Sequence, residues 1–377
     1  MTDPTQTRTN HLQELMRQEQ LAGIALNPGP DLSYFSGLEF HLMERPVLWI
    51  LPLEGPPVLV LPELEENKIK DRSTPVRPFT YNEDPATWPG VFQSALAEAG
   101  LLNGKLGVIP RRLRMLELTY IQGAAPDLEL DSAQDLIAIM RTRKDETEIA
   151  SMAEAARMAE CALSAILSSF KPGITEKEIA AKLVGRLLQE GSDPELPFFP
   201  IVSFGENSAN PHAVPGNRPL REGDLVLIDW GAGHNGYYSD ITRIFAMGDI
   251  PPELEKVAQF VREANAAGRE AVKPGALASE VDRAARKVIA DAGYSEFFIH
   301  RTGHGLGREA HEEPYISAFD DTELTPGMTF TIEPGIYLPN RGGVRIEDDV
   351  LVTEDGCRSL TSHTRKLTQL MFEEDLY

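Results

Sequence analysis

The chain of 377 residues is 42% hydrophobic and 25% charged, and it carries a formal net charge of −22 at pH 7. Its length favours two domains over a single core, and its composition is ordinary for a globular protein. The negative charge argues against nucleic acid and anionic membrane surfaces as partners, because both attract a basic surface.

The cysteine content and the N-terminus indicate the compartment. Cys161 and Cys357 are the only cysteines, and although they could form a disulfide, so few cysteines fit a reducing compartment better. Residues 1–10 are polar and lack the apolar core of a signal peptide. No stretch has the apolar length of a membrane-spanning helix. We therefore expect a cytoplasmic protein with no membrane partner.

The first part of the chain alternates between helix and strand patterns. This alternation predicts a compact α/β domain over residues 1–132. The domain shows no cluster of His, Asp and Glu with ligand spacing, so we interpret it as structural or as a wall of the substrate site. Residues 135–144 are expected to form a connector. The expected elements are a helix over 11–20, strands over 22–26, 47–53 and 58–61, a helix over 92–101, a strand over 106–110 and a helix over 111–122.

The second part, residues 133–377, groups its helices and its strands. A long helix should begin at Asp145 and end before the stop signal at 171–173, and Thr175 opens a second helix with a capping-box sequence. Grouped helices with antiparallel hairpins predict an α+β domain. The remaining expected elements are strands over 198–204, 225–229 and 237–246, helices over 253–272 and 277–292, and strands over 329–337 and 343–353.

A pair of acids flanks the first predicted hairpin of this domain. Asp229 ends a hydrophobic strand and Asp240 lies near the start of the next, with the turn residues of 231–236 between them. The midpoint at residues 234–235 predicts that the two acids lie at the same level on neighbouring strands. Facing like charges destabilise a sheet, so the pair calls for a cation. For this segment alone, a solvated hairpin tip with two unrelated acids is the simpler interpretation.

A second hairpin repeats this arrangement. Glu333 ends one strand pattern and Glu347 lies in another, and their midpoint is Asn340, inside a Gly- and Asn-rich turn. Two hairpins that each oppose two acids among strand hydrophobes are much harder to explain as solvated faces. The four acids are therefore candidate metal ligands.

The histidines differ in their surroundings. His304 lies between glycines that let the backbone pack closely and leave the imidazole accessible. His212 and His311 also stand in distinctive loops. A lone histidine is more often a satisfied structural residue than a ligand, and that interpretation is given to the others, which are His11, His41, His234, His300 and His363.

Charge balance favours two metal ions. Four carboxylates carry −4 and two divalent cations carry +4. One histidine with four carboxylates is a fairly hard ligand set, which favours Mn²⁺, Co²⁺, Zn²⁺ or Fe²⁺ over copper. Two such ions can activate a bridging water and polarise a carbonyl.

The order and surroundings of these residues resemble the pita-bread metallopeptidases, most closely the prolidase and aminopeptidase P branch. The matching motifs are Asp-Ile-Thr-Arg, Gly-His-Gly-Leu-Gly, Ile-Glu-Pro-Gly-Ile-Tyr and Arg-Ile-Glu-Asp-Asp. The resemblance covers residues 145–360 and implies an α+β pita-bread catalytic domain with a smaller creatinase-like α/β domain before it. It also implies that two metal ions, Mn²⁺ or Co²⁺, with Zn²⁺ or Fe²⁺ as alternatives, are held by Asp229, Asp240, His304, Glu333 and Glu347.

The resemblance further implies hydrolysis of an Xaa-Pro peptide bond by a metal-bridging hydroxide, with Glu333 as proton shuttle. By the same resemblance His212 and His311 bind substrate and stabilise the oxyanion, Arg345 steadies a ligand carboxylate, and Tyr337 lines the site. For Arg345 a strand-surface charge, and for Tyr337 core packing, are the alternatives. No residue independently encodes a preference for proline.

The chain length favours an Xaa-Pro dipeptidase acting on a proline-containing dipeptide, with an Xaa-Pro aminopeptidase acting on longer peptides as the second candidate. Methionine aminopeptidases generally lack such an N-terminal domain, and creatinase lacks the metal ligands. A non-catalytic metal-binding relative remains a distant alternative. The family resemblance also implies a homodimer.

Overall fold

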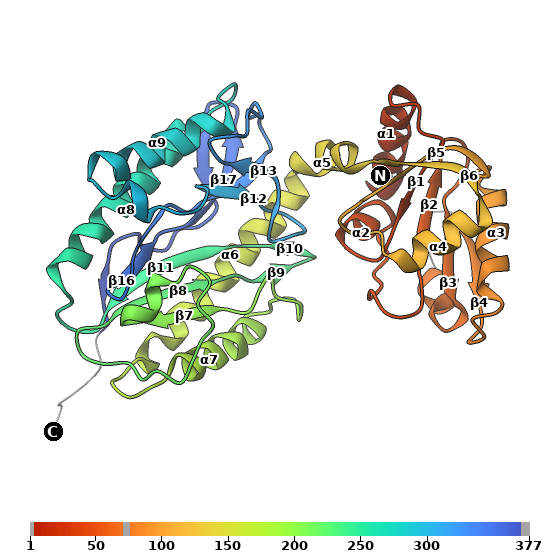
Figure 1. Cartoon of the computed structure of the whole chain (residues 1–377). Coiled ribbons are helices and arrows are strands. Elements are labelled where there is room, and N and C mark those ends of the chain that lie inside the picture. The colour runs from red at the N-terminus through yellow and green to blue at the C-terminus, as the bar shows by residue number, and fades with distance from the viewer. Residues whose placement is uncertain (1–3, 71–75, 371–377) are drawn as a thin grey trace. The chain divides into compact units, whose positions relative to one another are not determined.

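The computed structural model describes residues 4–70 and 76–370 (Figure 1). The chain divides into two compact units, Met1–Arg141 and Thr142–Tyr377. The domain boundary expected after residue 132 stays a prediction. The two compact units divide after Arg141, because the helix that follows residue 132, α5 (Gln134–Thr142), packs on the N-terminal core.

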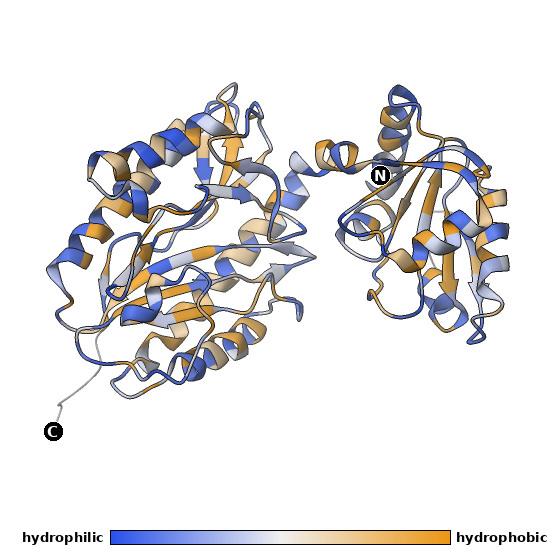
Figure 2. Ribbon diagram, in the orientation of Figure 1, coloured by the Kyte–Doolittle hydropathy of each residue, from blue (hydrophilic) through white to orange (hydrophobic). Residues whose placement is uncertain are grey.

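The N-terminal unit is built on one six-stranded sheet with the order β4-β3-β2-β1-β5-β6. Figure 2 shows mostly hydrophobic residues along its central strands, and β1, β2 and β3 are fully buried. Strands β2 and β3 pair antiparallel around the Gly-Pro-Pro turn at residues 55–57. The strands are β1 (Gly23–Leu26), β2 (Leu48–Pro52), β3 (Val58–Pro62), β4 (Arg77–Tyr81), β5 (Asn103–Val108) and β6 (Asp127–Ser132).

Helices cover both faces of this sheet. One core packs α1, α2 and α5 against it, and a second core packs α3 and α4. The pattern analysis missed α2, β4 and β6. These helices are α1 (Pro4–Gln18), α2 (Pro30–Ser36), α3 (Trp88–Glu98), α4 (Met115–Ala124) and α5 (Gln134–Thr142).

Residues 135–144 contain the boundary between the two units, as expected for a connector, and most of this segment is the helix α5, which was not predicted. Its side chains Leu136, Ile137 and Met140 are buried in the core shared with α1. Their spacing of one and four residues places them on one side of a helix. Amphipathic burial therefore decides the structure of this segment.

The C-terminal unit contains two helix pairs, α6 with α7 and α8 with α9 (Figure 1). Both predicted helix starts are confirmed, since Asp145 and Thr175 each form a capping box with the glutamate three residues later. The helices are α6 (Glu146–Ile166), α7 (Glu176–Gln189), α8 (Pro252–Ala271) and α9 (Ala278–Asp291), and short 3-10 turns span Glu63–Ile69, Leu167–Ser169, Gly205–Ala209 and Ser295–Phe297.

The strands of this unit pair antiparallel, except that β19 pairs parallel with β11. A four-stranded sheet has the order β19-β11-β8-β7, a five-stranded sheet the order β13-β12-β14-β17-β18, and β15-β16 and β9-β10 are separate pairs. The strands are β7 (Ile201–Phe204), β8 (Leu225–Trp230), β9 (Gly233–His234), β10 (Tyr237–Tyr238), β11 (Ile241–Ala246), β12 (Gly303–Gly305), β13 (Glu312–Ile316), β14 (Thr329–Ile332), β15 (Gly335–Leu338), β16 (Gly342–Arg345), β17 (Asp348–Thr353), β18 (Gly356–Ser359) and β19 (Thr368–Gln369).

Strand alternation determines where the polar side chains point. On β8, Val226 and Ile228 pack against α6 and α7, whereas Leu225 and Leu227 pack on the side of α8. Because strand side chains alternate between faces, Asp229 follows the second set. The acid therefore lies on the inner face, between the two halves of the unit.

The two acidic hairpins differ in register. In the first, Asp229 is opposite Thr242, so the expected direct opposition with Asp240 is wrong by two residues. The hairpin is centred on residues 235–236 and not on residues 234–235, and Asn235 adopts positive φ at this turn. Asp240 still lies on the face of Asp229, as a diagonal neighbour.

In the second hairpin the expected midpoint is confirmed. Ile332 pairs with Asp348, and Gly335, which is nearer the turn, pairs with Arg345. Both pairs are centred on Asn340, which adopts positive φ at the turn. An isolated bridge between Thr242 and Glu347 joins this hairpin to the first.

Among the described residues, no helix has the length and apolar character needed to cross a membrane.

Candidate metal centre

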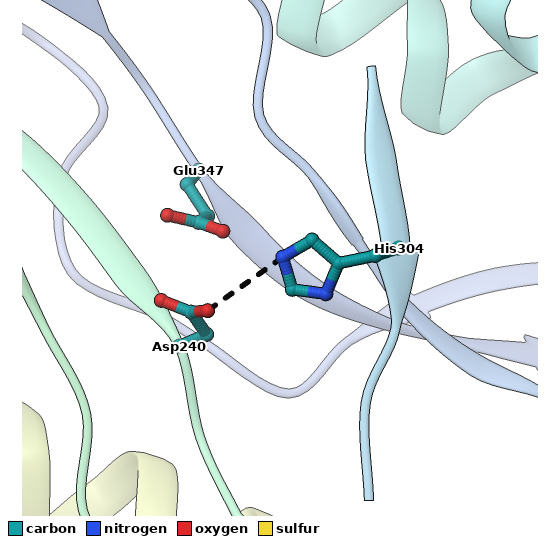
Figure 3. Close-up of side chains that lie close together, drawn as sticks. All are labelled: Asp240, His304 and Glu347. Carbon is teal, nitrogen blue, oxygen red and sulfur yellow. Dashed lines mark ion pairs between the residues drawn. The ribbon is translucent and has the colours of Figure 1, made fainter. Parts of the chain in front are cut away.

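Three buried side chains from different elements converge in the C-terminal unit. Asp240 precedes β11, His304 is on β12 and Glu347 precedes β17, and one ligand-type atom of each lies within 4.8 Å of the others (Figure 3). Nε2 of His304 is 3.8 Å from Oδ2 of Asp240 and 3.3 Å from Oε1 of Glu333. The imidazole is therefore surrounded by carboxylates.

Asp229 joins this group through Arg345. A guanidinium nitrogen of Arg345 donates to Oδ2 of Asp229 at 2.5 Å, and another donates to the Tyr337 hydroxyl at 2.8 Å. Thr242 donates to Oε2 of Glu347 at 2.6 Å and accepts from Arg345 at 3.0 Å. The sequence analysis missed Thr242, although it lies two residues after Asp240 and hence on the same strand face.

The carboxylates lack enough positive charge from the chain. Oδ1 of Asp229 and Oδ1 of Asp240 are buried and have no hydrogen-bond partner among the described residues. Burial, followed by neighbouring carboxylates, raises the pKa of Asp240 and of Glu347 well above their ordinary values. Burial also raises the pKa of Glu333 to about 7. Buried charges need a partner or a metal, and this oxygen-rich set with one imidazole fits a divalent cation.

The candidate residues line one pocket of about 650 Å³. Its wall includes every residue that the sequence analysis assigned to the site except Tyr337, which lies behind Arg345. The assigned residues in the wall are His212, Asp229, Asp240, His304, His311, Glu333, Arg345 and Glu347. All of them lie in the C-terminal unit.

Three further histidines line the same pocket as His304, namely His212, His300 and His311. The ring of His311 is 4.0 Å from the ring of His304, centre to centre. Burial lowers the pKa of His304, of His311 and of His300, the last to about 4, so these rings are neutral at pH 7. His212 is in the loop before β8, where its N–H donates to the side chain of Asn210.

His300, which was interpreted from the sequence as a structural residue, lies in the wall of the pocket. Its Nε2 lies 2.9 Å from the Tyr337 hydroxyl, so it continues the hydrogen-bonded row from Asp229 through Arg345. The pocket wall also contains Arg301, another residue that was not selected from the sequence. The spacing of His300 four residues before His304 was the available signal.

The glycines around His304 have the expected role. A Cβ atom at Gly303 would collide with the carbonyl oxygen of Thr331, and one at Gly305 with that of Glu313. Strands β13 and β14 therefore approach β12 more closely than any side chain would allow. This close packing brings the imidazole to the carboxylates.

Comparisons with known proteins agree with this site. The family described as metallopeptidase family M24 matches residues 150–354, and the creatinase/prolidase N-terminal domain matches residues 8–143. The chain is 38% identical to the probable dipeptidase PepE of Mycobacterium tuberculosis over 353 residues, 92% of each chain. It is 33% identical to the Xaa-Pro dipeptidase of Pyrococcus horikoshii over 363 residues, 94% of this chain and 96% of that one. The solved structure of a prolidase from Thermococcus sibiricus matches with a TM-score of 0.91 at 33% identity, covering 98% of this chain and 100% of that one.

Proposed function

This chain belongs to metallopeptidase family M24, and from that premise we propose that it is an Xaa-Pro dipeptidase that releases proline from dipeptides. Its pita-bread catalytic domain follows a creatinase-like N-terminal domain. The observation that carries the proposal is the pocket lined by three buried carboxylates, the half-buried carboxylate of Glu333, His304 and an apolar wall.

Asp229, Asp240, His304, Glu333 and Glu347 would hold two divalent cations, with Mn²⁺ or Co²⁺ as the first candidates. When bound, such ions supply a water of lowered pKa and polarise the scissile carbonyl. The two partnerless carboxylate oxygens, on Asp229 and Asp240, support this assignment.

The other side chains would manage protons and charge. Glu333 would take a proton from water and deliver it to the leaving nitrogen. His212 and His311 would donate to the oxygen that becomes negative in the transition state. Arg345 would hold Asp229 in place, and the Tyr337 hydroxyl would hold Arg345.

The apolar wall suits a proline residue. A proline nitrogen has no hydrogen to donate, and its ring fixes φ near −65°, so shape and apolar contact can select it. The wall is lined by Pro197, Phe198, Phe199, Ile201 and Pro211.

The test compares Ala-Pro with Ala-Pro-Ala-Ala, with Mn²⁺ or Co²⁺ supplied and a chelator control. Release of proline from the dipeptide alone is the expected result. Release of free alanine from the tetrapeptide would instead indicate an Xaa-Pro aminopeptidase. No hydrolysis of either peptide by metal-loaded protein would contradict the proposal and support a non-catalytic relative.

We further propose that the protein is a cytoplasmic homodimer that binds neither nucleic acid nor membranes. The two cysteines are both free, which agrees with a reducing compartment. Light scattering after size-exclusion chromatography tests the dimer, and a monomer mass near 41.6 kDa would contradict it.

A further inference from the structure

The segment that carries His212 is held in place from outside the pocket. This His212 loop, residues 205–216, lies in the connection from β7 to β8 and contributes Pro211 and His212 to the pocket wall. The side chain of His212 is exposed, so the backbone of the loop decides where the imidazole points. We infer that Glu176, which is not in the pocket wall, is a positioning residue for His212. The inference rests on the proposed function, which assigns His212 to the developing oxyanion.

Glu176 joins the two ends of the His212 loop. It is the first residue of α7 and is only 1% exposed. Its Oε1 accepts a hydrogen bond from the backbone N–H of Phe204 at 2.9 Å, and its Oε2 accepts one from the backbone N–H of Gly216 at 2.9 Å. One carboxylate therefore fixes the start and the end of the loop against the same helix.

The charge of Glu176 is compensated without a cation. Within residues 4–70 and 76–370 it forms no ion pair. Hydrogen bonds offset the cost of a buried charge, and the N-terminus of a helix stabilises a carboxylate. A carboxylate has two acceptor oxygens, whereas the amide of glutamine has one oxygen and one nitrogen that donates. Simultaneous contact with both ends of the loop therefore requires the acid.

A row of hydrogen bonds continues from Glu176 to His212. The side-chain nitrogen of Asn207 donates to Oε1 of Glu176 at 2.9 Å. The carbonyl of Asn207 accepts from the backbone N–H of Asn210 at 3.1 Å. The side-chain oxygen of Asn210 then accepts from the backbone N–H of His212 at 3.1 Å. The backbone at His212 is thus connected to the buried carboxylate through two asparagines.

The opposite side of the loop contacts β16. The hydroxyl of Ser208 donates to the carbonyl of Gly205 at 2.6 Å and accepts from the N–H of Gly343 at 2.8 Å. Arg345, at the end of β16, donates to the carbonyl of Pro211 at 3.4 Å. The loop is therefore held between α7 and the strand that carries Arg345, and Glu176 supplies the contact on the side of α7.

The experiment is a double-mutant cycle between Glu176 and His212. Hydrolysis of Ala-Pro is measured for metal-loaded wild type, Glu176→Gln, His212→Ala and the double variant. Glu178→Gln is the matched control, because it removes an acid from the same helical turn at an exposed position and glutamine keeps the capping box. Asn207→Ala tests the same row of hydrogen bonds while Glu176 stays bonded to both ends of the loop, so the test does not depend on the folding of Glu176→Gln. Metal content and thermal unfolding are measured for every variant.

We expect Glu176→Gln to lower kcat by about 10–100-fold, up to the loss that follows a misplacement of about 1 Å. KM should change little, because the oxyanion forms only in the transition state. In the His212→Ala background the same substitution should lower kcat by less than about 2-fold, since the group that Glu176 positions is absent. Asn207→Ala should show a smaller loss with the same dependence on His212, and Glu178→Gln should behave as wild type.

A second measurement reports on His212 without turnover. In protein that carries ¹³C-labelled histidine and diamagnetic Zn²⁺, the ring resonance of His212 is identified by its absence from His212→Ala. Glu176→Gln should shift this resonance, and Glu178→Gln should leave it in place.

Equal losses of kcat from Glu176→Gln with and without His212 would overturn the inference, as would an unmoved His212 resonance. Both results leave the proposed function intact when the wild type cleaves Ala-Pro. A wild type that does not cleave Ala-Pro would contradict the proposed function, whereas a shifted resonance in that protein would still support the placement of His212 by Glu176.

Discussion

Two buried acidic clusters lie back to back in the C-terminal unit, and they differ in how their charge is balanced. The metal cluster consists of Asp229, Asp240, Glu333 and Glu347. The arginine cluster is centred on Asp348, whose carboxylate is fully buried. Arg243 donates to one of its oxygens at 2.8 Å and Arg365 to the other at 2.7 Å.

The side chains of the protein balance the negative charge of the arginine cluster more fully than that of the metal cluster. Burial would raise the pKa of Asp348, yet Arg243 and Arg365 hold that pKa below its ordinary value. In the metal cluster, burial and the neighbouring acids raise the pKa of Asp240 and Glu347. A carboxylate with a raised pKa in the folded state weakens folding when it is ionised. The comparison teaches that burial alone does not identify a metal ligand, because the fully buried Asp348 is neutralised by arginines whereas the pKa values of buried Asp240 and Glu347 are raised.

Strand geometry separates the two clusters. Glu347 and Asp348 are consecutive residues, so their side chains point to opposite faces. Asn265 on α8 connects the faces, since its side-chain nitrogen donates to the carbonyls of Ile332 and Ile346 and to Asp348. Those carbonyls directly precede Glu333 and Glu347. The arginine cluster thus positions the metal cluster from behind.

The largest expected effect comes from removing a charge in the metal cluster. Asp240→Asn should lower kcat by at least about 10²–10³-fold, the size of losing one transition-state contact, and should weaken metal binding. Metal at 100 times its Kd should stabilise the wild type by about 2.7 kcal/mol and the variant by much less. Urea unfolding with and without Mn²⁺, together with turnover of Ala-Pro, provides the measurement. A variant with near-normal rate and metal content would contradict the assignment of Asp240.

A smaller loss of rate should follow from a change beside the metal cluster. His311→Ala should lower kcat by about 10²–10³-fold, because a donor to the oxyanion is lost. Its metal content should stay normal, as measured by elemental analysis of the purified variant. If metal is lost instead, His311 is a ligand and the roles assigned here are wrong.

The arginine cluster should respond in stability and much less in chemistry. Arg243→Met removes one partner of a buried ion pair, which typically costs about 3–5 kcal/mol, because Asp348 is left underneutralised. Urea unfolding of the metal-free protein measures this loss. Arg283→Met, at an exposed position, should change stability by no more than about 0.5 kcal/mol. Equal effects of the two substitutions would remove the distinction between the clusters.

The smallest expected effect comes from His300, whose imidazole stays neutral in the folded protein. Burial, followed by the charge of Arg345, lowers the pKa of His300 to about 4, against about 6.5 in an unfolded chain. Between these values the unfolded state binds more protons, so the free energy of unfolding falls as the pH falls. The contribution between pH 7 and pH 5 is about 2 kcal/mol.

Urea unfolding of metal-free wild type and His300→Gln at both pH values measures this contribution. The variant should lose less stability than the wild type on acidification, because the group that gains a proton on unfolding is absent. The same pH dependence in both proteins would show that His300 carries no such penalty.

Local patterns in the sequence were sufficient for much of the fold. The capping boxes at Asp145 and Thr175 and the turn at Asn340 are local signals, and the structure has each of them in place. The register around Asp229 and Asp240 was misjudged, because the turn is centred on residues 235–236, where Asn235 adopts positive φ, and not on residues 234–235. The helix α5 was not predicted, because its buried residues depend on a core that also includes α1, more than a hundred residues earlier in the sequence.

The sequence by itself determined which acids and histidines are candidates for the site and in what order they occur on the predicted strands and turns. It could do so because strand alternation and turn chemistry act over a few residues. Only the tertiary structure decided which buried acid is neutralised by arginine, since Arg243, Asp348 and Arg365 come from separate elements. It also decided that His300 and Arg301 line the pocket. The physical reason is that burial and charge balance depend on groups that meet only when the sheets close around the site.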